Sequence, residues 1–329
     1  MTESADSVSL RGRSPAKPVA ITTRARDVLP TLAGATGMVC VGGSVAVSGA
    51  LADAPVLTVQ SLRYAAACLL LLGYARATRH TLVRPRGTDW LWLGGVVLSG
   101  MVIFNLALVY GSRHAEPAVL GVAVACVPLL LAVGGPVLEG HGPAPRLVLA
   151  AVVVTGGAAL VQGLGRADAT GLGWAAVTFA CEAGFTLLAV PLLGRHGPLG
   201  VSVHSTWLAA VVFAVLGAGR EGVGAVTRLR ADDLAAAVYL AVAVTALAFV
   251  LWYTCVDRLG AARAGLLTGI APVSAAVTGV ALGGPMPRPL VWAGVGLVAA
   301  GLALGLRPGG VPATTVPASA VTPGGADRG

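Results

Sequence analysis

Charged side chains are scarce within the long apolar stretches of this 329-residue sequence. The few that occur there are the candidates for binding a substrate or an ion. Glu182 is the one acid in the middle of such a stretch, eleven residues from each end of 171–193. In a helix it lies roughly 16 Å from either end. A carboxylate at the centre of a bilayer costs about 2.5–3.5 kcal/mol, so it must face a cavity, a partner or a proton. We expect Glu182 to bind a substrate amine or a proton; the alternative is a neutral carboxyl hydrogen-bonded between helices.

Three further polar residues complete the expected binding set. Arg63 is the one basic residue inside an apolar stretch. It can meet an anionic substrate group or Glu182, or it can anchor backbone carbonyls and extend toward the interface. Asn105 offers directional hydrogen bonds to a substrate, or else bridges two helices. Ser44, in the first apolar stretch, is expected to line the same cavity.

The composition indicates what positions these residues. The sequence is 56% hydrophobic and 11% charged, whereas soluble domains average about 45–50% and about 25%. Apolar stretches of bilayer-spanning length fall at 30–50, 55–75, 90–111, 116–138, 146–163, 171–193, 200–219, 233–254, 262–283 and 288–306. Backbone polar groups in lipid must be satisfied within the segment, so these stretches are predicted to be helices. The fold class is therefore an all-α polytopic membrane protein with ten transmembrane helices.

Arginine placement predicts the orientation. With ten spans both termini lie on one side, and that side collects fifteen of the 22 lysines and arginines. Cytoplasmic loops carry this excess, so both termini are predicted to be cytoplasmic. The same excess explains the net charge of +8 without nucleic acid as a partner. Polar and Pro/Gly-rich composition predicts disordered tails over 1–29 and 307–329.

An internal repeat divides the chain. Residues 128–160 align without a gap on 272–304, pairing Pro128 with Pro272 and matching glycines and prolines around the loops. The repeat unit, 30–163 and then 171–306 after an external linker at 164–170, contains five helices. An odd number requires inverted topology, which is typical of transporters. Pro128 and Pro272 are expected to break helices 4 and 9 as hinges or site-forming elements, unless they only set static packing.

Several segments resemble the EamA-like family of the drug/metabolite transporter superfamily. They are GGSVAVSGALADAPVLTVQSLRYAAACLLL, NLALVYGSRHAEPAVLGVAVACVPLLLAVGGPVLEG and AFVLWYTCVDRLGAARAGLLTGIAPVSAAVTGVALGG. The resemblance implies ten helices in two five-helix repeats, with a cavity lined by helices 1, 3, 4, 6, 8 and 9. It makes Trp252 and Tyr253 candidates for an inner gate; the alternative is an aromatic belt at the headgroups.

These features together predict a secondary transporter in the inner membrane, an exporter of small metabolites such as amino acids. Its expected partners are a small-molecule substrate, membrane lipid and, through small-residue helix faces, a second copy in a homodimer. No enzyme motif is present, five dispersed cysteines lack metal-site spacing, and neither a cofactor nor a metal is expected. The alternative is a non-transporting membrane scaffold or receptor-like protein of the same fold.

Overall fold

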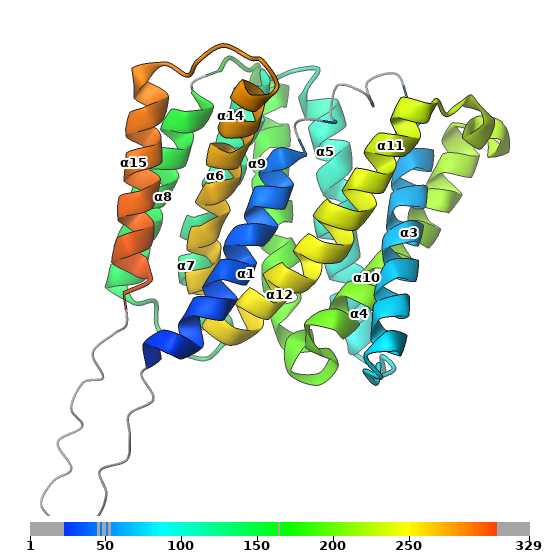
Figure 1. Ribbon diagram of the computed structural model, residues 1–329, viewed down its shortest axis with the longest axis horizontal. Coiled ribbons are helices and arrows are strands. Elements are labelled where there is room, and N and C mark those ends of the chain that lie inside the picture. Colours follow the sequence, from blue (N-terminus) through cyan, green and yellow to red (C-terminus); the bar gives the residue numbers. More distant parts are fainter. Residues whose placement is uncertain (1–22, 45–46, 48–50, 52–53, 164, 308–329) are drawn as a thin grey trace, which may run out of the picture.

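The computed structural model describes residues 23–44, 47, 51, 54–163 and 165–307, and these residues form a bundle of helices (Figure 1). The helices in the first half of the chain are α1 (Thr23–Gly43), α3 (Val56–Ala77), α4 (Asp89–Val97), η1 (Leu98–Ile103), α5 (Phe104–Gly111), α6 (Pro117–Ala125), α7 (Val127–Leu138) and α8 (Pro145–Gln162). Those in the second half are α9 (Ala169–Leu187), α10 (Val190–Arg220), η2 (Val223–Arg228), α11 (Ala231–Tyr239), η3 (Leu240–Leu247), α12 (Ala248–Leu259), α13 (Ala261–Leu266), η4 (Leu267–Gly269), α14 (Ile270–Ala281) and α15 (Pro289–Gly305).

Many of these helices carry an apolar surface that faces outward. Seven helical segments of the described chain are long and apolar enough to cross a membrane: Val56–Ala77, Asp89–Gly111, Pro117–Leu138, Pro145–Gln162, Val190–Arg220, Ala231–Leu259 and Ala261–Ala281. Leu91, Leu69 and Val215 are 77%, 69% and 68% exposed. Large apolar side chains exposed on so many helices need lipid rather than water around them. The protein is therefore a multi-pass membrane protein.

The helices run up and down the bundle, and distant parts of the chain lie side by side. In Figure 1, α1 begins and α15 ends at the lower end of the bundle. Extensive contacts join α8 to α15, α3 to α10 and α1 to α12. All three pairs bring the first half of the chain against the second, and the main hydrophobic core lies between the halves.

Glycines allow α8 and α15 to approach closely. A Cβ on Gly157 would lie 2.7 Å from the Gly294 carbonyl oxygen, and one on Gly294 would lie 2.6 Å from the Gly157 carbonyl oxygen. Small residues permit such backbone contact between membrane helices. In the protein, these glycines thus join two helices of one chain.

Two proline-containing segments are broken where the repeat pairs Pro128 with Pro272. The α6 helix ends at Ala125 and α7 begins at Val127, so Pro128 lies in the first turn of the second helix. Pro272 lies in the first turn of α14, after the 3₁₀ turn η4. Proline is tolerated in a first turn because the N–H it lacks has no intrahelical acceptor there. Both prolines therefore lie at local interruptions of the helical hydrogen bonding, where Cys126 and Gly269 keep right-handed helical φ and ψ values.

Two π-helical segments occupy corresponding positions in the two halves. The shift that places Pro128 on Pro272 places η1 on residues 242–247, within η3. A π-helical turn is uncommon and is often found at functional sites. Both segments adjoin the central cavity described below.

Some boundaries differ from the sequence-based expectation. The tail predicted over 1–29 is helical from Thr23 onward. The apolar pattern marks only the part of a helix that is suited to lipid, so it does not indicate the polar first turns of α1. Residues 1–22 and 308–329 of the predicted tails lie outside the described residues. The first helix ends at Gly43 rather than near residue 50. The segment Val190–Arg220 consists of two helices joined at Gly197, whose φ of 65° is non-helical, and the second of them begins close to the expected start of the seventh span at residue 200.

The carboxylate of Asp168 caps α9 and ties it to the connection between α5 and α6. It accepts hydrogen bonds from the Gly171 N–H at 2.7 Å and contacts His114 Nδ1 at 2.9 Å. The Gly171 N–H, followed by the His114 contact, lowers the pKa of this carboxyl. A lowered folded-state pKa stabilises the fold above the unfolded value of about 3.9, and this stabilisation disappears as pH falls through the folded pKa.

Asp168→Ala is accordingly expected to lower the melting temperature of the detergent-solubilised protein at pH 7, because α9 loses its cap. The difference from wild type should shrink as the pH is lowered below 4. Scanning fluorimetry across this pH range measures both effects. Asp232→Ala, which removes an exposed carboxylate from the first turn of α11, is the control. A difference from wild type that does not change with pH contradicts the assigned role of the carboxylate.

Candidate functional site

A cavity of about 160 Å³ lies inside the bundle between the two halves of the chain. This volume holds several waters but is smaller than the roughly 300–1,000 Å³ of a drug-sized ligand site. Helices α1, α3, α5, α6, α9 and α12 and both π-helical segments supply the lining residues, which are Met38, Val41, Arg63, Tyr64, Gly100, Phe104, Asn105, Val124, Glu182, Phe185, Val244, Ala248, Phe249 and Trp252. We call it the central cavity.

Glu182 lies on α9 and faces the central cavity. Its side chain is half-buried, and among the described residues it makes no ion pair and no hydrogen bond. Around it the wall is largely apolar, with Phe185, Phe249 and Trp252 on the lining. A carboxylate in such surroundings attracts a cation or a proton, because no side chain of the described wall forms an ion pair or a hydrogen bond with it.

Arg63 lines the same cavity but is held by other partners. Its Nε donates to Thr245 Oγ1 at 2.7 Å, one Nη donates to Gln60 Oε1 at 3.2 Å, and its guanidinium lies 5.1 Å from the ring centre of Tyr64. These partners are neutral, so the guanidinium keeps its full positive charge within the cavity wall. Arg63 and Glu182 thus present opposite charges to one small cavity without forming an ion pair.

A chain of hydrogen bonds connects the two π-helical segments through Arg63. Gln60 Nε2 donates to Asn105 Oδ1, and Asn105 Nδ2 donates to the Met101 carbonyl oxygen of η1 at 2.5 Å. At the other end, Arg63 reaches Thr245 of η3. We call the side chains Asn105, Gln60, Arg63 and Thr245 the polar strap. The polar strap fixes Arg63 on one wall of the cavity. Asn105 bridges α5 to α3 through Gln60 and also lines the cavity.

The two aromatic residues proposed as a gate lie in the bundle interior. Trp252 lines the central cavity and donates from Nε1 to Thr186 Oγ1 at 3.1 Å. Tyr253 is fully buried and packs 5.2 Å from the Phe185 ring, but it does not line the cavity. Neither residue therefore belongs to a belt at the headgroups, and Trp252 alone forms part of the wall.

Other candidates lie away from the cavity lining. Ser44 follows the end of α1 and donates to the Val41 carbonyl oxygen at 2.7 Å. Pro128 and Pro272 are buried at the helix breaks and also lie outside the lining. Within the described residues, no cluster of three or more His, Cys, Asp and Glu side chains could hold a metal ion.

Gln60 was not singled out from the sequence, although it holds the strap together. It is 6% exposed and lies one helical turn before Arg63 on α3. A glutamine three residues from a mid-span arginine is a recognisable signal, because residues three apart share a helix face. Its contact with Asn105, 45 residues along the chain, has no signature in the sequence.

Gln60→Leu is expected to leave the protein folded but to reduce its transport rate, because Arg63 and Asn105 each lose a partner that positions them. A neutral hydrogen bond contributes about 0.5–1.5 kcal/mol, which corresponds to a decrease of roughly two- to tenfold. Transport at matched membrane levels measures the effect. Gln162→Leu, near the end of α8, is the matched control, and equal rates for the two variants contradict the role of the strap.

A membrane transporter can use a small cavity of this kind, which lies between helices of both halves and carries opposite charges on its walls. The model of the EamA-like transporter family matches residues 29–162 and 169–307. The chain therefore belongs to the EamA-like transporter family, and it is a membrane transporter of the drug/metabolite type.

Individual relatives are more distant. A probable terminal-alkyne amino-acid exporter of Streptantibioticus cattleyicolor is 26% identical over 223 residues, covering 67% of this chain and 74% of the relative. The uncharacterized transporter YetK of Bacillus subtilis is 26% identical over 263 residues, covering 76% and 79%. A protein of known crystal structure superposes on this chain with a TM-score of 0.71 and 18% sequence identity. The superposition covers 84% of this chain and 97% of the other protein's chain. This last similarity concerns the fold.

Proposed function

We propose that the protein exports small amino-acid-like zwitterions, and that the central cavity is its substrate site. The observation that carries this proposal is the unpaired Glu182 facing the same cavity as the cationic Arg63. A substrate ammonium group binds Glu182, and its carboxylate binds Arg63. The name of the Streptantibioticus cattleyicolor relative, an amino-acid exporter, supports this substrate class.

Transport proceeds by alternating access between two inverted five-helix repeats, ten spans in all. Support comes from the opposed directions of α1 and α9, from the repeat-related breaks before Pro128 and Pro272, and from the paired π-helical segments. The breaks serve as hinges at which each half bends around the cavity. Both termini face the cytoplasm and the protein resides in the inner membrane, as the arginine distribution favours.

Glu182 also couples transport to protons. Once the zwitterion has left, an ionised carboxylate would remain unpaired inside the membrane, at a cost of about 2.5–3.5 kcal/mol. A proton taken up from the outer side neutralises it, and the empty carrier returns. The substrate and the proton therefore exchange at one carboxylate, which makes the inward proton gradient the energy source for export.

Metabolite export from intact cells tests this function. Cells that express the protein and matched cells that do not are fed dipeptides, which raise the internal amino-acid pools, and mass spectrometry then follows the medium. Expression is expected to accelerate the release of one class of amino acid or related zwitterion. Identical release profiles across the fed panel contradict the proposal and favour the scaffold alternative.

A further inference from the structure

Three cavities follow one another from the middle of the bundle to its surface. The central cavity shares Asn105 with a second cavity of about 270 Å³, whose other walls are mostly apolar. The second cavity shares Ala54, Arg220 and Glu221 with a third of about 310 Å³. We call the third cavity the outer pocket; besides the shared residues it is lined by Pro55, Arg228, Arg230 and Asp233.

Both carboxylates of the outer pocket accept hydrogen bonds from backbone N–H groups. Glu221 accepts hydrogen bonds from the Leu57 N–H at 2.9 Å, the Thr58 N–H at 2.8 Å and the Thr58 hydroxyl at 2.7 Å. It thereby caps the first turn of α3, whose N–H groups have no intrahelical acceptor. Asp233 caps α11 by accepting from the Arg230 N–H at 2.8 Å.

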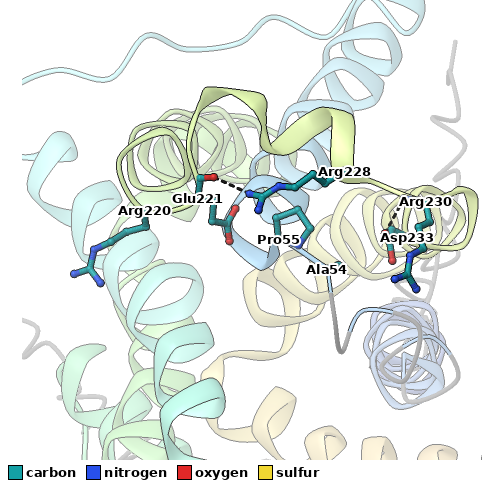
Figure 2. A pocket seen from close by; sticks show the side chains of 7 residues that line it. All are labelled: Ala54, Pro55, Arg220, Glu221, Arg228, Arg230 and Asp233. Carbon is teal, nitrogen blue, oxygen red and sulfur yellow. Dashed lines mark hydrogen bonds between the residues drawn. The ribbon is translucent and has the colours of Figure 1, made fainter.

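The three guanidinium groups of the pocket remain available. Within the described part of the chain, Arg220, Arg228 and Arg230 form no ion pair with an acid. Arg228 is held in place because its Nη2 donates to the Glu221 carbonyl oxygen at 2.7 Å (Figure 2). In the same view Arg220 points away from Arg228 and Arg230, so positive charge extends from the second cavity to the outer pocket.

We propose that the outer pocket is a second, transient binding site for the carboxylate group of the substrate, on the route between the central cavity and the outside. Guanidinium groups bind carboxylates through paired charge-assisted hydrogen bonds. A zwitterion that leaves Glu182 passes Asn105, crosses the apolar second cavity and meets these arginines. The proposal rests on the proposed function, because it takes the exported compound to carry a carboxylate.

Arginine-selective modification tests the pocket directly. The purified full-length protein, in phosphatidylcholine nanodiscs, is treated with phenylglyoxal, and mass spectrometry measures the rate at each arginine. L-Alanine is the probe, and L-alaninamide at equal ionic strength is the control that lacks a carboxylate. Alanine is expected to slow modification of Arg228 and Arg230 about threefold relative to alaninamide. This is the decrease expected if alanine occupies the pocket for roughly two thirds of the time. Arg166, which is exposed and paired with Glu116, is expected to react at an unchanged rate.

The outcomes separate this proposal from the proposed function. Protection that persists in Glu182→Gln supports an outer pocket independent of the central cavity, even if wild-type cells export nothing. Full export by Arg228→Gln together with equal modification rates in alanine and alaninamide overturns the pocket and leaves the proposed function standing. Protection by phosphatidylglycerol nanodiscs without any amino acid also overturns it, since the site then binds a lipid phosphate.

Discussion

Glu182→Gln is expected to reduce export about 10- to 100-fold, because a hydrogen bond to a charged partner contributes about 1.5–3 kcal/mol and the amide lacks the charge. The amide has nearly the shape of the carboxylate, so expression and melting temperature should remain close to wild type. Glu182→Asp keeps the charge but shortens the side chain, and we expect it to retain part of the activity.

Export of the compound identified in fed cells, normalised to the membrane level of each variant, measures this effect. Glu116→Gln is the matched control, because it makes the same substitution at an exposed carboxylate that pairs with Arg166. Normal export by Glu182→Gln would remove the carboxylate from the mechanism. It would then be a structural group, as the alternative interpretation of the sequence holds.

Gly157→Ala should destabilise the protein by about 1–3 kcal/mol, the usual effect of overpacking a close contact. The new Cβ would lie 2.7 Å from both the Gly294 carbonyl oxygen and the Val298 nitrogen. These are backbone atoms, so the contact is relieved only if α8 and α15 separate. The reciprocal Gly294→Ala variant meets the Gly157 carbonyl oxygen and should behave in the same way.

The neighbouring Gly156 provides the control for this prediction. A Cβ on Gly156 would meet no atom within 4 Å, and alanine is favoured over glycine in a helix by about 0.8–1.0 kcal/mol. Gly156→Ala should therefore leave the melting temperature in detergent unchanged or slightly raised, while Gly157→Ala lowers it. Equal shifts for the two variants would show that the close approach of α8 and α15 does not limit stability.

The sequence predicted the class of protein and several of its cavity residues. Apolar stretches of bilayer length indicate membrane helices wherever they occur, because lipid imposes the same demand on every backbone. Glu182 stands out on the same ground, since mid-span carboxylates are costly and need a cavity or a partner. The structure places Glu182, Arg63, Asn105 and Trp252 on one cavity. Their transport roles remain the proposal tested above.

The geometry that joins these residues depends on contacts between distant parts of the chain. Arg63 meets Thr245 across 182 residues, and Gln60 meets Asn105 across 45. No periodicity or motif encodes such pairs. The π-helical segments are equally hidden, because η1 and η3 read as ordinary apolar helix in the sequence. The sequence also does not show that Ser44 lies beyond the first helix. The apolar stretch continues to residue 50, whereas α1 ends at Gly43.

Side-specific labelling of the central cavity tests alternating access most directly. Val124 lines the cavity from α6, and Val124→Cys in a functional variant without the five native cysteines offers one reactive thiol. An impermeant maleimide is applied from either face of oriented membrane vesicles, with and without the exported compound. We expect labelling from both faces, with the compound changing the two rates in opposite directions. Labelling from one face alone under every condition would contradict alternating access and indicate a non-transporting membrane protein of this fold.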